Sequence, residues 1–99
     1  MDKIRIMLVD KREIFREGLF KILEGWDKFE VVYRGSNGLE SVDRAKALKP
    51  DIVLLDTDIQ DCDFIEAIAG MKNVSSKSKI IILTHSEKDK DLFSALKLG

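Results

Sequence analysis

Hydrophobic and polar positions along the chain alternate between two periods. Short, nearly continuous apolar runs predict strands at about residues 3–9, 29–33, 51–55 and 80–83. Between these runs, apolar residues recur three and four positions apart and predict helices around residues 15–23, 39–48, 64–72 and from 86 up to Gly99. A regular strand and helix alternation of this kind is typical of a doubly wound parallel sheet in an α/β fold.

The third apolar run is the one most typical of a central strand. Ile52, Val53, Leu54 and Leu55 follow one another without a polar residue, which favours a strand covered on both faces. Turn and stop signals separate the other elements. Gly25 and Pro50 can end the first two helices, and Ser86 with Asp89 approximates a capping box for the last.

Three of the predicted strands end in polar residues. The first strand runs into Asp10, the third into Asp56 and the fourth into Thr84. Ligands of open α/β sheets bind beyond the carboxyl ends of the strands, so these groups can converge on one small anionic or metal-bound ligand. Asp56 is the best candidate for the chemistry, and the presence of Lys11 directly after Asp10 complicates the site.

The composition excludes several classes of protein. The chain has 99 residues, 44% hydrophobic and 35% charged, which fits one globular domain. No apolar stretch approaches a membrane span, so we expect a cytoplasmic protein without membrane contact. Seventeen basic and 18 acidic residues are interspersed, and we expect no nucleic acid to bind these residues. Cys62 is the only cysteine, and its acidic neighbours disfavour a reactive thiolate.

Three stretches of the sequence resemble the receiver domain of bacterial two-component response regulators, in particular those attached to LuxR-type output domains. Together they cover essentially the whole chain. They are IMLVD at 6–10 with FREGL at 15–19, KPDIVLLD at 49–56, and IIILT at 80–84 with ALKLG at 95–99.

The resemblance implies a fold and a mechanism. The fold would be a flavodoxin-like sheet of order 2-1-3-4, with residues 1–99 forming one receiver domain truncated before its fifth strand and helix. A sensor histidine kinase would phosphorylate Asp56, and Mg²⁺ would be held by Asp10, Asp56 and Asp58. The hydroxyl of Thr84 would then bond the phosphoryl oxygen. This change would control a DNA-binding output that acts in transcription and is absent from this chain.

The sequence departs from the family pattern near this site. Lys11 stands where the family has a second acid, and there it can either substitute in part for the metal beside Asp56 or point into solvent and leave a weakened Mg²⁺ site. Asp58 can either restore a negative ligand or remain a solvated loop acid. Gln60 and Asp61 replace the proline and glycine usual in the following loop.

Two other functions remain open on sequence grounds. A degenerate receiver would act by protein interaction alone, without phosphate. Asp56, Thr57 and Asp58 also resemble the haloacid-dehalogenase-type phosphatase motif, but that motif normally lies on the first strand and has a threonine where this chain has Gln60. We therefore expect a protein that is not an enzyme. A homodimer through the exposed fourth strand or fourth helix is also expected.

Overall fold

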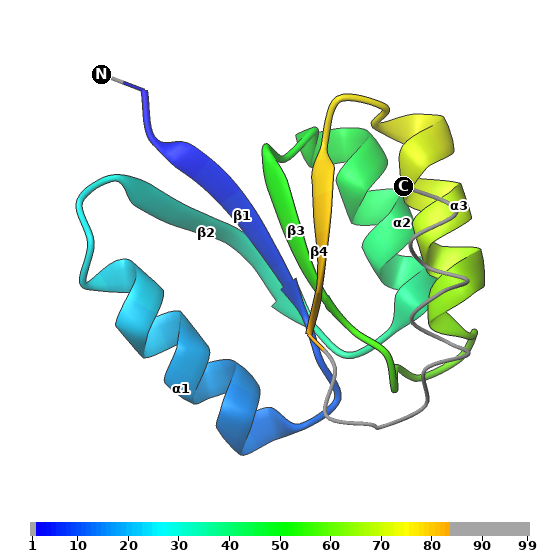
Figure 1. The fold of residues 1–99 in the computed structure, drawn as a ribbon, viewed down its shortest axis with the longest axis horizontal. Helices are drawn as coiled ribbons and strands as arrows, with labels where there is room; N and C mark the ends of the chain where they lie inside the picture. The colour runs from blue at the N-terminus through cyan, green and yellow to red at the C-terminus, as the bar shows by residue number, and fades with distance from the viewer. Residues whose placement is uncertain (1, 84–99) are drawn as a thin grey trace.

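The structure, a computed structural model, describes residues 2–83 and shows one parallel sheet with helices on both faces (Figure 1). The strands are β1 (Ile4–Val9), β2 (Phe29–Gly35), β3 (Ile52–Asp56) and β4 (Lys79–Leu83), and the helices are α1 (Glu13–Glu24), α2 (Gly38–Leu48) and α3 (Phe64–Val74). The strand order is β2-β1-β3-β4, with every neighbouring pair parallel. The predicted α/β class and the order 2-1-3-4 are confirmed. The predicted fourth helix lies outside the described residues.

Local sequence signals account for the ends of the helices. The side chain of Asp63 caps α3 by accepting a 2.8 Å hydrogen bond from the backbone N–H of Glu66. Helix α2 ends at Leu48, and its C-cap residue Lys49 adopts a left-handed conformation with φ of 47°. Pro50 follows directly and does not favour a helical residue before it, so the chain turns there into β3.

The main core lies between the sheet and helices α2 and α3, which cover the same face (Figure 1). Alternation along β1 directs Met7 and Val9 to this face, and Val53 and Leu55 reach it from β3. The buried core consists of Met7, Val9, Ala45, Val53, Leu55, Phe64, Ala67, Ile68 and Met71. This layer fixes β1 and β3 side by side, and the two strands set the positions of the residues that follow them.

Helix α1 covers the opposite face less completely. None of its residues is buried, and Ile22 of the predicted apolar stripe keeps 63% of its surface exposed. On β4, the outer strand of the described sheet, Ile80 and Ile82 pack against the main core. Ile81 lies between them with 47% exposure and so points to the α1 side.

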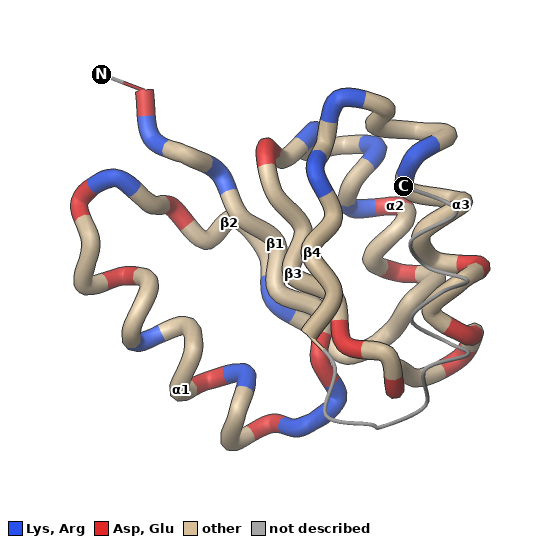
Figure 2. The backbone as a smooth tube through the Cα atoms, viewed as in Figure 1, with Lys and Arg blue, Asp and Glu red and all other residues tan. Residues whose placement is uncertain are grey.

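Charges of both signs are spread over the described elements (Figure 2). Lys and Arg residues form no continuous stripe along any helix or strand in this part of the chain, and acidic residues lie among them. Within residues 2–83, no helix has the length and apolar character needed to cross a membrane.

Candidate functional site: two aspartates and an arginine at the end of the sheet

Asp10 and Asp56 lie next to each other at the carboxyl edge of the sheet. Asp10 directly follows β1 and Asp56 is the last residue of β3. These strands are neighbours in parallel register, with Val9 opposite Leu55. Both carboxylates are buried, and the side chain of Asp56 has 0% exposure. The structure thus brings together two of the acids that the sequence predicted at this edge.

The cation next to these acids is Arg12, which the sequence analysis did not single out. Its Nε and Nη2 atoms donate hydrogen bonds of 3.1 and 2.8 Å to the two carboxylate oxygens of Asp10. The same Nε lies 3.9 Å from a carboxylate oxygen of Asp56. A guanidinium group is a planar fork that matches a carboxylate in this two-bond arrangement. One side chain therefore contacts both acids.

The backbone directs Arg12 to this position. Arg12 is the N-cap residue of α1, in an extended conformation, and its backbone N–H donates a 2.8 Å hydrogen bond to Oδ1 of Asp10. An aspartate that bonds the N–H two residues later forms an Asx-turn. The turn brings the Arg12 side chain back over the carboxylate that formed it, and the guanidinium also lies 4.0 Å from the ring centre of Phe15.

The electrostatic environment keeps Arg12 charged. Its hydrogen bonds to Asp10 raise the guanidinium pKa further above an already basic value, and the charges of Asp10, Asp56 and Asp58 act in the same direction. Burial has the opposite, smaller effect. Arg12 is therefore a permanent cation beside the two buried acids.

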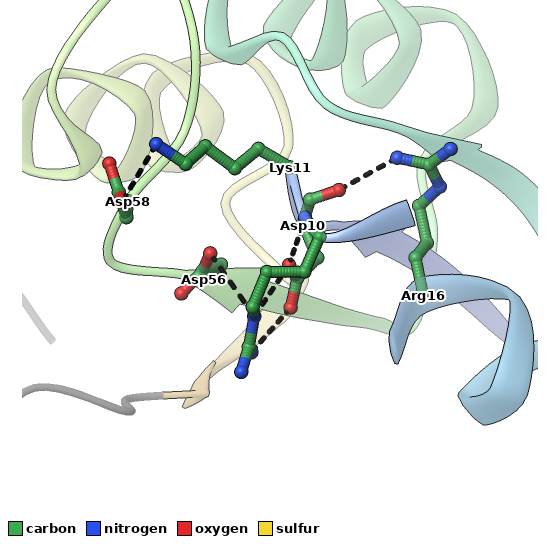
Figure 3. Close-up of polar contacts among 6 residues, drawn as sticks. Asp10, Lys11, Arg16, Asp56 and Asp58 are labelled. Carbon is green, nitrogen blue, oxygen red and sulfur yellow. Dashed lines mark hydrogen bonds and ion pairs between the residues drawn. The ribbon is translucent and has the colours of Figure 1, made fainter. Parts of the chain in front are cut away.

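Arg16 adds a second link between α1 and the end of β1. Its Nη1 atom donates a 2.8 Å hydrogen bond to the backbone carbonyl of Asp10 (Figure 3). Its Nε lies 3.4 Å from Glu17. The first two turns of α1 are thereby tied to the residue that carries the acid.

Lys11 reaches toward the exposed loop after β3. Its Nζ lies 2.9 Å from a carboxylate oxygen of Asp58, and both side chains are about half exposed (Figure 3). Lys11 therefore pairs with the loop after β3 and not with Asp10, while Asp58 is held by a lysine. The adjacent cations Lys11 and Arg12 therefore pair with different acids.

The loop after β3 is attached to the start of α2. The backbone N–H of Gln60 donates to the carbonyl of Ser36, and the carbonyl of Gln60 accepts from Gly38, each at 3.0 Å. Asp61 adopts a left-handed conformation with φ of 67°, and its side chain accepts a 3.1 Å bond from the N–H of Leu39. Aspartate tolerates this region better than most residues, so Asp61 can make the turn without the family's glycine.

The other predicted residues are placed as follows. Thr84 lies outside the described residues. Within residues 2–83, the structure contains no group of three histidine, cysteine or acidic side chains that could hold a metal ion, and Asp10, Asp56 and Asp58 do not form one. Burial raises the pKa of the Cys62 thiol, and Asp61 adds to the effect, which agrees with an unreactive cysteine.

Comparisons with known proteins identify the family. The family model "Response regulator receiver domain" matches residues 6–99. Response regulator protein VraR of Staphylococcus aureus (strain Mu3) is 34% identical over 96 residues, which make up 97% of this chain and 46% of that protein. The chain thus spans about half the length of the curated relatives it matches.

Solved structures show the same fold. A LuxR-family two-component response regulator from Aurantimonas sp. SI85-9A1 matches with a TM-score of 0.89 and 28% identity, covering 99% of this chain and 70% of that one. A chain of the CheX-CheY-BeF3-Mg complex from Borrelia burgdorferi matches with a TM-score of 0.88 and 20% identity, covering 99% and 74%, a likeness of fold alone. The chain belongs to the family of response regulator receiver domains, with LuxR-type regulators among its relatives.

Proposed function

We propose that this receiver domain accepts a phosphoryl group on Asp56 from a sensor histidine kinase and so controls a DNA-binding output in the same regulator. The observation that supports this is the position of Asp56, a buried carboxylate at the end of a central strand, beside Asp10 and 3.9 Å from a guanidinium nitrogen. The output is inferred from the LuxR-family relatives, because the chain spans 46% of its VraR relative.

The proposed step is a transfer between a phosphohistidine and a carboxylate. A carboxylate oxygen of Asp56 forms a bond to phosphorus, the bond from phosphorus to the kinase imidazole nitrogen breaks, and the imidazole leaves with its electron pair and takes up a proton. The product adds negative charge next to Arg12, whose fork suits phosphoryl oxygens as well as carboxylates. Competition between the phosphoryl group and Asp10 for Arg12 would supply the difference between two states that a switch requires. The hydroxyl of Thr84 would be a further donor.

Mg²⁺ does not fit the residues as they are arranged here. Arg12 occupies both carboxylate oxygens of Asp10, and Lys11 holds Asp58. Binding of Mg²⁺ by Asp10, Asp56 and Asp58 after those cations have moved away stays a prediction.

The test is phosphorylation followed by intact mass. Acetyl phosphate in the presence of Mg²⁺, or a purified sensor kinase with ATP, should add one phosphoryl group to the wild type and none to Asp56→Asn. Asp51→Asn is the matched control, because Asp51 precedes the other end of β3, where it accepts a hydrogen bond from Arg5, and should leave labelling unchanged. Equal labelling of Asp56→Asn, or none of the wild type by either donor, would contradict the proposal.

A second candidate is a receiver that works through its surface without phosphate. The contacts of Lys11 and Arg12 favour it, since cations already neutralise the acids of the site. In this case a full-length regulator carrying Asp56→Asn would keep wild-type control of its output, measured by DNA binding or reporter expression. Pairing of two copies through β4 also stays a prediction, measurable by light scattering.

A further inference from the structure

We propose that Arg12 is the built-in cation of this site and that, while it spans Asp10, the site takes up no divalent cation at millimolar concentration. This inference concerns the domain before any phosphorylation and does not depend on the proposed function. Asp10 and Asp58 were expected to bind Mg²⁺, but in the structure they contact cationic side chains.

The space and the free ligand directions at Asp10 do not suit Mg²⁺. Mg²⁺ needs oxygen ligands at about 2.0–2.1 Å in near-ideal octahedral geometry. The guanidinium donates to Oδ1 and Oδ2 of Asp10 at 3.1 and 2.8 Å, and the backbone N–H of Arg12 donates to Oδ1 at 2.8 Å. Three donors therefore use three of about four acceptor directions from which a metal would approach Asp10.

Arg12 already supplies a positive charge to the buried acids Asp10 and Asp56. Asp10 and Asp56 are both buried, and two neighbouring carboxylates in a low-dielectric environment need a cation between them. Arg12 supplies one charge to both, with contacts of 2.8 Å to Asp10 and 3.9 Å to Asp56. A divalent ion brought to the same place would meet a permanent positive charge as well as the two acids.

Moving the Arg12 side chain away from Asp10 would cost free energy. The side chain is joined to the site by its own backbone, so its local concentration is high and independent of the ion in solution. Displacing it would break its two side-chain hydrogen bonds to Asp10 and remove its contact with the Phe15 ring. Lys11 adds to the effect by pairing with Asp58, the third acid expected to hold the ion.

The alternative is that the contact between Arg12 and Asp10 is weak and yields readily to Mg²⁺. The two interpretations differ in what the wild type does. A readily displaced arginine predicts millimolar binding in wild type and variant alike, whereas a built-in cation predicts binding only after the guanidinium has been removed.

The experiment is a calorimetric titration of the unphosphorylated protein with Mg²⁺ alone. We expect no saturable binding by the wild type and millimolar binding by Arg12→Gln, at least about tenfold tighter than any wild-type signal. Arg34→Gln is the matched control. Like Arg12, Arg34 pairs with an acid and lies over a Phe ring. Its guanidinium lies 2.9 Å from Glu17 and 3.7 Å from the ring centre, but Arg34 belongs to β2. It should behave as the wild type does.

Three results would overturn the inference. They are wild-type binding as tight as that of Arg12→Gln, an equal gain in Arg34→Gln, and no binding by an Arg12→Gln protein whose circular dichroism shows a native fold. If Arg12→Gln fails to fold, wild-type thermal unfolding decides: an unchanged melting temperature with added Mg²⁺ supports the inference, and a rise overturns it. Because no phosphodonor is present, these outcomes are separate from any failure of Asp56 to be phosphorylated.

Discussion

Lys11 and Arg12 are adjacent cations that each pair with an aspartate, yet they belong to different environments. The Lys11 pair is exposed, with 53% of the Asp58 side chain accessible, whereas Arg12 meets the buried carboxylate of Asp10 through a fork of two bonds. Exposed pairs contribute little to stability because water screens them, but a buried acid deprived of its donors is costly. The environment of the acid, more than the charge of its partner, decides which cation shapes the site.

The largest effect should come from changing the buried acid. Asp10→Asn keeps the shape of the side chain but removes the charge that accepts three hydrogen bonds from Arg12. We expect the free energy of unfolding to fall by about 1.5–3 kcal/mol, measured by urea unfolding. Asp58→Asn makes the same chemical change at the exposed pair and should cost no more than about 1 kcal/mol. Equal losses would remove the distinction between the two pairs.

A smaller effect should follow from exchanging the two cations. Arg12→Lys keeps the charge but replaces the fork by a single ammonium group, so about 1 kcal/mol of unfolding free energy should be lost. Lys11→Arg provides the reverse change at the exposed pair and should leave stability nearly unchanged. Comparable losses for both would show that geometry does not matter at Asp10. Urea unfolding measures both variants.

The smallest effect should be that of removing Lys11. Lys11→Gln should change unfolding free energy by at most about 1 kcal/mol at low salt, because the pair is exposed. The difference should vanish near 1 M salt, where the Debye length is about 3 Å. A loss that persists in high salt would place Lys11 in a less solvated environment than its contact with Asp58 indicates.

The sequence was sufficient for the fold and for part of the site. The apolar runs predicted β1 to β4, since continuous runs such as residues 52–55 occur where both faces are covered, and the resemblance to receiver domains implied the strand order. Strand ends also predicted that Asp10 and Asp56 would be neighbours. These features depend on the period of the apolar residues and on parallel topology, which can be recognised from the order of residues in the sequence.

The cation of the site could not be assigned in the same way. Lys11 was the residue considered, because it follows Asp10 directly, but the chain reverses there and carries Arg12 back to the acids. The available signal was an aspartate two residues before the N-cap of a helix, a spacing that favours an Asx-turn. Side-chain direction within that turn depends on φ and ψ and is not readable from residue types alone.

The limited burial of α1 has a further consequence for the site. Local opening requires least free energy where few side chains are buried, and α1 has no buried residue, whereas α3 buries Phe64, Ala67, Ile68 and Met71. Arg12 caps α1, and Arg16 ties the same helix to Asp10. Fraying at the start of α1 would therefore remove the cation from the acids. The charge of the site is coupled in this way to the least anchored helix of the described domain.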